Sequence, residues 1–148
     1  MNHLAVGTVT TLFLLAFPQD AEPIRKDKAA LQATWKVTES VSKGEKVPAE
    51  DIKDLALIFK GDAILIREGG KTFENFAFTI DPTKKIKEID LTLKVGPQKG
   101  RVDRGIYQID GDILRICIQS NKDAPRPSEF RSPLGSDLWL VVLQRSKE

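Results

Sequence analysis

Histidine and cysteine are nearly missing from this chain, which contains one of each, His3 and Cys117. A single cysteine cannot form an intramolecular disulfide, so the fold must depend on core packing and strand pairing. Ser-His-Asp catalysis, Cys-His catalysis and histidine-based zinc sites all need a histidine in the folded domain. His3 lies in a segment that we expect to be removed. We therefore expect a protein that is not an enzyme and that needs no cofactor or metal, the catalytic alternative being an unidentified activity without histidine.

The chain also lacks any concentrated block of one charge. Its 23 basic and 21 acidic residues are spread along 148 positions and leave a formal net charge of +2. Nucleic-acid binding needs a basic face, preferably with exposed aromatic side chains, and neither is visible in the sequence. The charge pattern is typical of a solvated surface, so we expect no nucleic-acid partner.

Long apolar runs are missing beyond residue 17, and the one such run is Leu4–Phe17. It is shorter than the roughly 20 residues of a membrane-spanning helix but matches the apolar region of a secretory signal peptide. We expect residues 1–21 to be a signal peptide cleaved after Ala21 or nearby, although Gln19 fits poorly at the −3 position. Export to the periplasm or the extracellular space follows, with no stable membrane span after cleavage. An uncleaved or incorrectly assigned start is the alternative.

Helical periodicity is scarce after this leader, and short β-type runs separated by turn residues replace it. Residues 22–32 suit a linker with one helical turn over Ile24–Gln32, and Pro48–Lys53 is a second short helical candidate. We expect one barrel domain over residues 33–148. The expected strands are Thr34–Glu39, Leu55–Lys60, Ala63–Glu68, Thr72–Asp81, Ile89–Val95, Arg101–Ile109, Ile113–Gln119 and Leu138–Arg145.

Several of these strands alternate apolar and polar residues, which indicates one buried and one wet face. Ile89–Val95 shows this most regularly, whereas Leu138–Arg145 is apolar on both faces and is expected to be covered on both sides. In Thr72–Asp81, Phe73 is out of phase, which predicts a bulge near Glu74–Asn75. Short connections exclude the crossover helices of a parallel sheet. The pattern predicts an all-β, antiparallel up-and-down barrel of about eight strands, with a sandwich as the alternative.

Five stretches in order along the chain carry a family resemblance: Leu31–Val37, Gly105–Asp112, Leu114–Cys117, Arg126–Phe130 and Val141–Arg145. On these the chain resembles an uncharacterised lipocalin-like domain family that is common in planctomycete bacteria. The resemblance implies a lipocalin-like barrel in an often exported protein, and no established activity. The family usually has glycine two residues before the tryptophan, where this chain has Ala33, so the entry of the first strand is in question.

Closure of the barrel would pair the first strand with the last and bring Trp35 to Arg145. The guanidinium could then lie over the indole, a contact worth about 0.5–2 kcal/mol, and seal one end. Lipocalins use a similar Trp–Arg arrangement, and the resemblance suggests it here. The alternative is a core Trp35 and a solvated Arg145.

Candidate ligand-binding residues are the large side chains on the apolar faces of two strands and two residues of the proline-containing loop Ser120–Gly135. The loop residues are expected at the open mouth, where Arg126 could bind an anionic headgroup and Phe130 could cover an apolar ligand. The alternative is a lid with Phe130 as a plug. The full candidate set is Phe76, Phe78, Ile89, Leu91, Leu93, Arg126 and Phe130.

Two further features are expected to be structural. Asp110-Gly111-Asp112 is read as a hairpin turn rather than a calcium loop, because further acidic ligands are missing nearby. Cys117 faces away from the most apolar side of its strand and is expected to be an inert, partly covered side chain, an intermolecular disulfide or reactive thiol being the alternative.

Two functions are compatible with this sequence. An exported barrel could bind a small apolar or amphipathic molecule in its lumen. Alternatively, the large side chains fill the lumen, and the protein is a non-catalytic interaction or structural module whose protein partner is unknown.

Overall fold

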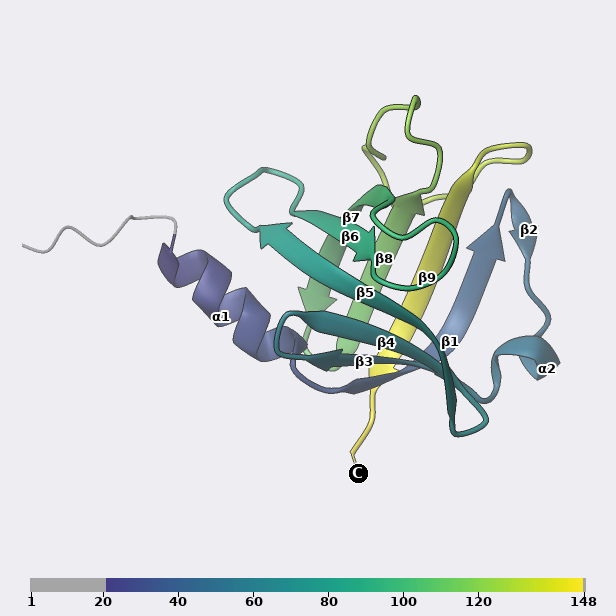
Figure 1. The fold of residues 1–148 in the computed structure, drawn as a ribbon, viewed down its shortest axis with the longest axis horizontal. Coiled ribbons are helices and arrows are strands. Elements are labelled where there is room, and N and C mark those ends of the chain that lie inside the picture. The colour runs from purple at the N-terminus through teal and green to yellow at the C-terminus, as the bar shows by residue number, and fades with distance from the viewer. Residues whose placement is uncertain (1–20, 148) are drawn as a thin grey trace, which may run out of the picture.

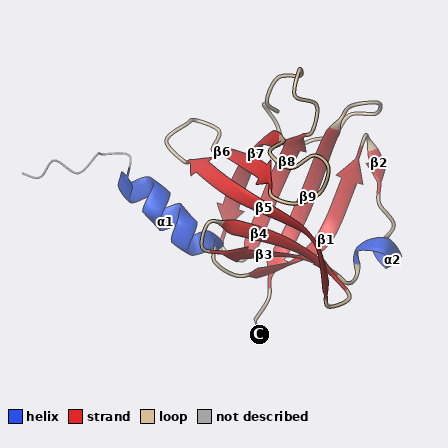
Figure 2. Ribbon diagram, viewed as in Figure 1, coloured by secondary structure: helices blue, strands red, loops and turns tan. Residues whose placement is uncertain are grey.

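The computed structural model of this chain describes residues 21–147, and eight of the nine strands in that range close into one antiparallel barrel (Figure 1). Two short helices flank it (Figure 2). The elements are α1 (Ala21–Leu31), β1 (Thr34–Ser42), β2 (Glu45–Lys46), α2 (Ala49–Ile52), β3 (Leu55–Lys60), β4 (Ala63–Glu68), β5 (Lys71–Asp81), β6 (Glu88–Leu93), β7 (Val102–Asp110), β8 (Ile113–Gln119) and β9 (Leu138–Arg145).

The strands follow an up-and-down order, in which β3 to β9 each pair with their neighbours in sequence. The barrel closes where β1 pairs with β9, from Trp35 opposite Arg145 to Ser42 opposite Trp139. The start of β1 also pairs with β3, which completes the ring. The predicted fold class is confirmed: the first and last barrel strands pair, whereas the two sheets of a sandwich would each end in unpaired edge strands.

Along the barrel strands, side chains that point into the core alternate with side chains on the outer surface. In β6, Ile89, Leu91 and Leu93 are buried while Asp90 and Thr92 between them are partly exposed. Inward side chains of all eight barrel strands, with Leu31 and Ile52 from the two helices, form one continuous hydrophobic core. Its size agrees with a barrel in which most of the interior is filled by side chains.

Two bulges adjust which residues face inward. The register between β4 and β5 shifts at Phe73, which lies beside the predicted bulge at Glu74–Asn75 and is half exposed. A second bulge at Thr38 in β1 was not predicted. Because a bulge adds one residue to one strand, the Thr38 bulge turns Ser40 toward the interior, where it is 3% exposed.

Helix α1 differs from the single helical turn that we expected over Ile24–Gln32. Within the described residues it covers Ala21–Leu31 and so occupies most of the expected linker. Its local sequence is charged and weakly apolar, so contacts with the barrel stabilise it more than helix propensity does. Leu31 is fully buried in the core, and Asp27 is nearly so. The expected signal peptide lies outside the described residues except for Ala21.

The strand ends also differ in detail from the expectation. Strand β1 continues to Ser42 and forms a hairpin with β2 across Lys43 and Gly44, both of which have positive φ. Lys43 is the one non-glycine residue with positive φ within residues 21–147.

Ala33 therefore needs no glycine-like conformation, and its carbonyl accepts a hydrogen bond from the Phe59 N–H at 3.0 Å. The entry to β1 is therefore unstrained at Ala33.

Candidate ligand-binding site

The two ends of the barrel differ in how they are covered. Helix α1 lies at one end, where Lys28 pairs with Asp62 of the β3–β4 turn and Lys87 lies 2.7 Å from Asp27 (Figure 1). The opposite end carries the β1–β2 and β4–β5 turns, the β6–β7 connection and the long loop of residues 120–137. We call these the closed end and the open end.

Trp35 and Arg145 seal the closed end through the contact that we expected from strand pairing. The Arg145 guanidinium lies 4.3 Å from the centre of the Trp35 ring. Trp35 Nε1 donates to the Leu31 carbonyl at 2.8 Å, and Arg145 Nη2 donates to the Ala30 carbonyl at 2.8 Å. These are carbonyls of the last turn of α1, which lack partners inside the helix. The two side chains therefore join the barrel to its helical cap.

A second set of polar contacts joins α1 to the barrel through Asp27. The Tyr107 hydroxyl donates to Asp27 Oδ2 at 2.8 Å, and Lys87 Nζ donates to the same oxygen at 2.7 Å. Burial raises the pKa of Tyr107 far above its ordinary value, and the hydrogen bond to the Asp27 carboxylate raises it further. The phenol is therefore a permanent donor at neutral pH, and no acid–base role is available to it there.

A cavity of about 180 Å³ opens inside the barrel toward the open end. Its deeper wall is apolar, and its outer part carries charged, hydroxyl and indole groups. The lining residues are Leu57, Ile64, Ile66, Glu74, Phe76, Leu91, Arg101, Asp103, Ile118, Ser120 and Trp139.

The polar part of this cavity centres on an ion pair between neighbouring inward positions at the start of β7. Arg101 Nε and Nη2 donate to the two oxygens of Asp103, each at 2.9 Å, and Arg101 Nη1 donates to Gln98. The Asp103 side chain is 6% exposed, so its carboxylate is buried and the bidentate pair with Arg101 compensates its charge.

The remaining polar members are Glu74 of β5, Trp139 of β9 and Ser120, which follows β8. Glu74 continues the inward face of Phe76 and Phe78 one position closer to the opening. Trp139 faces inward from β9, and its Nε1 donates to Ser40 Oγ at 2.8 Å. The sequence interpretation missed Glu74, Arg101, Asp103 and Trp139. The signal that could have found them was their place on an inward face, next to the strand end at the open side.

All five lumen candidates predicted on β5 and β6 face the interior and are buried. Phe76 and Leu91 line the cavity. Phe78, Ile89 and Leu93 lie in the packed core instead, and Phe78 meets Phe59 edge to face with ring centroids 5.2 Å apart. Side chains therefore fill much of the lumen, and a cavity remains beside the start of β7.

Arg126 lies on the outer wall, which differs from its expected place at the mouth. Its Nη1 donates to Asp90 Oδ1 at 2.7 Å, to the Gly105 carbonyl at 2.8 Å and to the Ile89 carbonyl at 3.2 Å. Asp90 points outward from β6, so the guanidinium is fixed against the outside of β6 and β7. This side chain anchors the loop and is not directed into the lumen.

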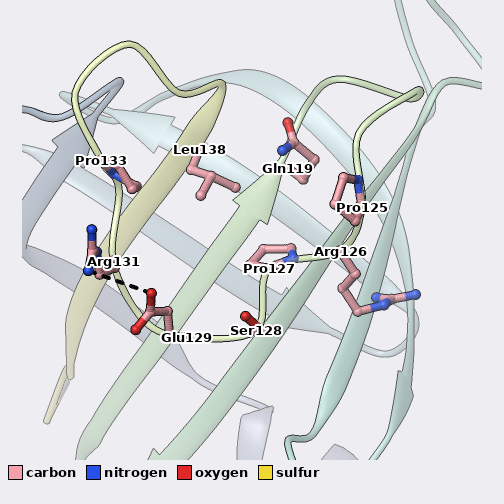
Figure 3. Close-up of a pocket in the computed structure, with 9 residues that line it drawn as sticks. All are labelled: Gln119, Pro125, Arg126, Pro127, Ser128, Glu129, Arg131, Pro133 and Leu138. Atoms are coloured by element: carbon pink, nitrogen blue, oxygen red, sulfur yellow. Dashed lines mark ion pairs between the residues drawn. The ribbon is translucent and has the colours of Figure 1, made fainter.

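The loop encloses a separate hollow of about 200 Å³ against the outside of β8 and β9 (Figure 3). Prolines 125, 127 and 133 and Leu138 form much of its wall, and Arg131 pairs with Glu129 across 3.7 Å. The Arg126 side chain runs away from this hollow (Figure 3). Phe130 borders a different outer depression beside Gln108, so it neither plugs nor lines the lumen cavity.

The same loop covers Cys117, which is fully buried although it faces outward from β8. Its Sγ lies 3.5 Å from the Arg131 carbonyl. Burial raises the pKa of the thiol, so the unreactive protonated form is favoured. On β9, the outward residues Leu138, Leu140 and Val142 are half-buried, which shows that the doubly apolar strand is covered in part on its outer side.

Comparison of this chain with family models, with curated proteins and with solved structures finds no match. Within residues 21–147, no helix is long and apolar enough to cross a bilayer. In the same range, no three His, Cys, Asp or Glu side chains come together as a metal site. The strand order and the cavity geometry are thus the observations from which function is inferred.

Proposed function

We propose that this chain is an exported, non-catalytic, lipocalin-like protein that holds one small apolar or amphipathic molecule in the open half of its barrel. The cavity supports this proposal, because side chains fill the closed half and leave about 180 Å³ next to the opening. An engineered cavity of about 150 Å³ in another protein admits benzene, so this space suits a single ring or a short alkyl chain.

The arrangement of the lining also supports binding rather than packing alone. Leu57, Ile64, Ile66, Phe76 and Leu91 supply an apolar wall, while the charged and indole groups lie nearer to the opening. Ligand sites commonly combine an apolar surface with a few polar groups that orient the ligand. An amphipathic molecule would place its apolar part against Phe76 and its polar end beside Arg101 and Glu74.

The direct test is a titration with n-hexanol in which the amide chemical shifts of the protein report binding. Saturable shifts should be confined to cavity residues such as Ile66, Leu91 and Ile118. An Ile66→Phe variant, which adds volume inside the cavity, should lose the binding. An Ile113→Phe variant, which adds the same ring on a partly exposed position at the closed end, should keep it.

Shifts that do not saturate, or that appear only around Leu138 on the outer wall, would contradict the proposal. The interaction module would then be favoured, with Leu134 in the long loop, 80% exposed, as the first residue to test for partner contact. Native mass spectrometry of protein from its own host would show whether a small molecule accompanies it. Sequencing of the N-terminus of that protein would test export, which requires a mature chain that begins near residue 22.

A further inference from the structure

This inference rests on the proposed binding function. We infer that the polar end of the ligand is a protonated amine and that the Glu74 carboxylate binds it. The cavity surface offers one carboxylate without a partner in the described residues, whereas most of its donors are engaged. This imbalance selects the sign of the ligand's charge.

Glu74 is the free acceptor. It lies on the inward face of β5 next to Phe76, opposite Ile66 of β4, and all three residues line the cavity. Its carboxylate makes no ion pair or hydrogen bond with any other residue of the described range 21–147. It is half-buried, so a ligand resting on Phe76 would have this carboxylate within reach of its polar end.

The donors around the same cavity already have partners. Arg101 uses Nε and Nη2 on Asp103 and Nη1 on Gln98. Trp139 Nε1 donates to Ser40, and Ser120 Oγ donates to the Asp137 carbonyl at 3.2 Å. Two of the five N–H groups of Arg101 make none of these bonds, but they share the cavity with the Asp103 and Glu74 carboxylates. These carboxylates repel a carboxylate ligand and attract an ammonium group.

The formal charge of the lining agrees with this reading. One cation, Arg101, and two carboxylates, Glu74 and Asp103, leave an excess of one negative charge at the cavity. Arg101 and Asp103 compensate each other through their bidentate pair, so Glu74 carries the uncompensated charge. A bound ammonium would neutralise it inside a partly enclosed site, where screening by solvent is weaker than at the surface.

Three probes with the same six-carbon chain test the inference at neutral pH: n-hexylamine, n-hexanol and n-hexanoate. Binding is measured by amide chemical shifts and by calorimetry. We expect n-hexylamine to bind about tenfold more tightly than n-hexanol, and n-hexanoate to bind more weakly than both. In a Glu74→Gln variant, n-hexylamine should lose its advantage over n-hexanol.

The matched control is Glu39→Gln, which removes the same charge from an exposed position on the outer wall of β1. It should leave the order of the three probes intact. If n-hexanol binds but n-hexylamine has no advantage, or if n-hexanoate binds best, the amine inference is overturned and the binding function stands. If none of the three binds, the proposed function itself fails.

Discussion

Arg145, at the end of the last strand, lies with its guanidinium 4.3 Å from the centre of the ring of Trp35, near the start of the first strand. Both side chains also donate to carbonyls in the last turn of α1. One contact therefore links the first strand, the last strand and the helical cap at the closed end. We therefore expect its loss to weaken closure of the barrel as well as the local contacts of the two side chains.

Replacement of Arg145 with methionine should lower the free energy of unfolding by about 2 kcal/mol. The cation–π contact contributes about 0.5–2 kcal/mol and the bond to the Ala30 carbonyl about 1 kcal/mol, while the partly exposed pair with Asp112 adds little. Urea unfolding measures the loss. Trp35 emission, recorded in a Trp139→Phe background, should shift because the ring loses its cationic neighbour. Arg115→Met, on the partly exposed outer side of β8, is the control and should change neither quantity.

Replacement of Arg126 with methionine should release the loop of residues 120–137 from the outer wall. The variant loses three hydrogen bonds to β6 and β7, and Cys117 beneath the loop should become accessible. The rate of thiol labelling by iodoacetamide should rise at least about tenfold, because labelling needs local opening. Arg131→Met, at an exposed position in the same loop, is the matched control. Equal labelling rates in both variants would show that Arg126 does not hold the loop.

Ionisation of Tyr107 should occur only as the protein unfolds. Its pKa in the folded state is raised, by burial first and by Asp27 second, above the ordinary value of 10.0. The unfolded chain therefore loses this proton at lower pH than the folded chain does, and stability falls as the pH rises above about 10, by at most about 1.4 kcal/mol per pH unit. Below that pH the contribution is fully present.

Two measurements check this behaviour. Tyr107 is the single tyrosine of the chain, so ultraviolet absorbance of the tyrosinate reports on it alone. The absorbance change should coincide with loss of the folded state. In a Tyr107→Phe variant, the alkaline decline of stability should become shallower, and a tyrosine that titrates near its ordinary value in the folded protein would contradict the buried contact with Asp27.

Gly44 and Gly70 should differ in their tolerance of alanine although both have positive φ, +85° and +83°. A Cβ at Gly70 meets no atom within 4 Å, so Gly70→Ala should cost only the backbone strain, about 1–2 kcal/mol. A Cβ at Gly44 would lie 2.2 Å from Leu134 Cα, so Gly44→Ala should cost about 1–3 kcal/mol more. Thermal unfolding of the two variants measures the difference. Equal losses would show that the loop does not pack on this turn.

Much of the barrel could be predicted from the sequence because strand alternation and turn chemistry are local. Ile89, Leu91 and Leu93 share one face at any register, so their inward orientation followed from spacing alone. The pairing of Trp35 with Arg145 followed once closure was assumed, since the first and last strands of an up-and-down barrel are neighbours.

Other features depended on contacts between distant residues. The docking of α1 uses contacts of Asp27 with Tyr107 and Lys87, which lie 80 and 60 residues away in sequence. Arg126 was expected at the mouth, but the outward Asp90 and two strand carbonyls hold it on the wall. Loop position is set by such distant partners, which alternation does not report.

The amino-acid order by itself determined the eight barrel strands and their apolar faces, because each follows from side-chain period and turn residues. Only the tertiary structure decided how deep each inward residue lies. Depth separates Phe78, packed against Phe59, from Phe76, which borders the cavity with Glu74. The physical reason is that volume left unfilled inside a barrel depends on all strands together, whereas alternation describes one strand at a time.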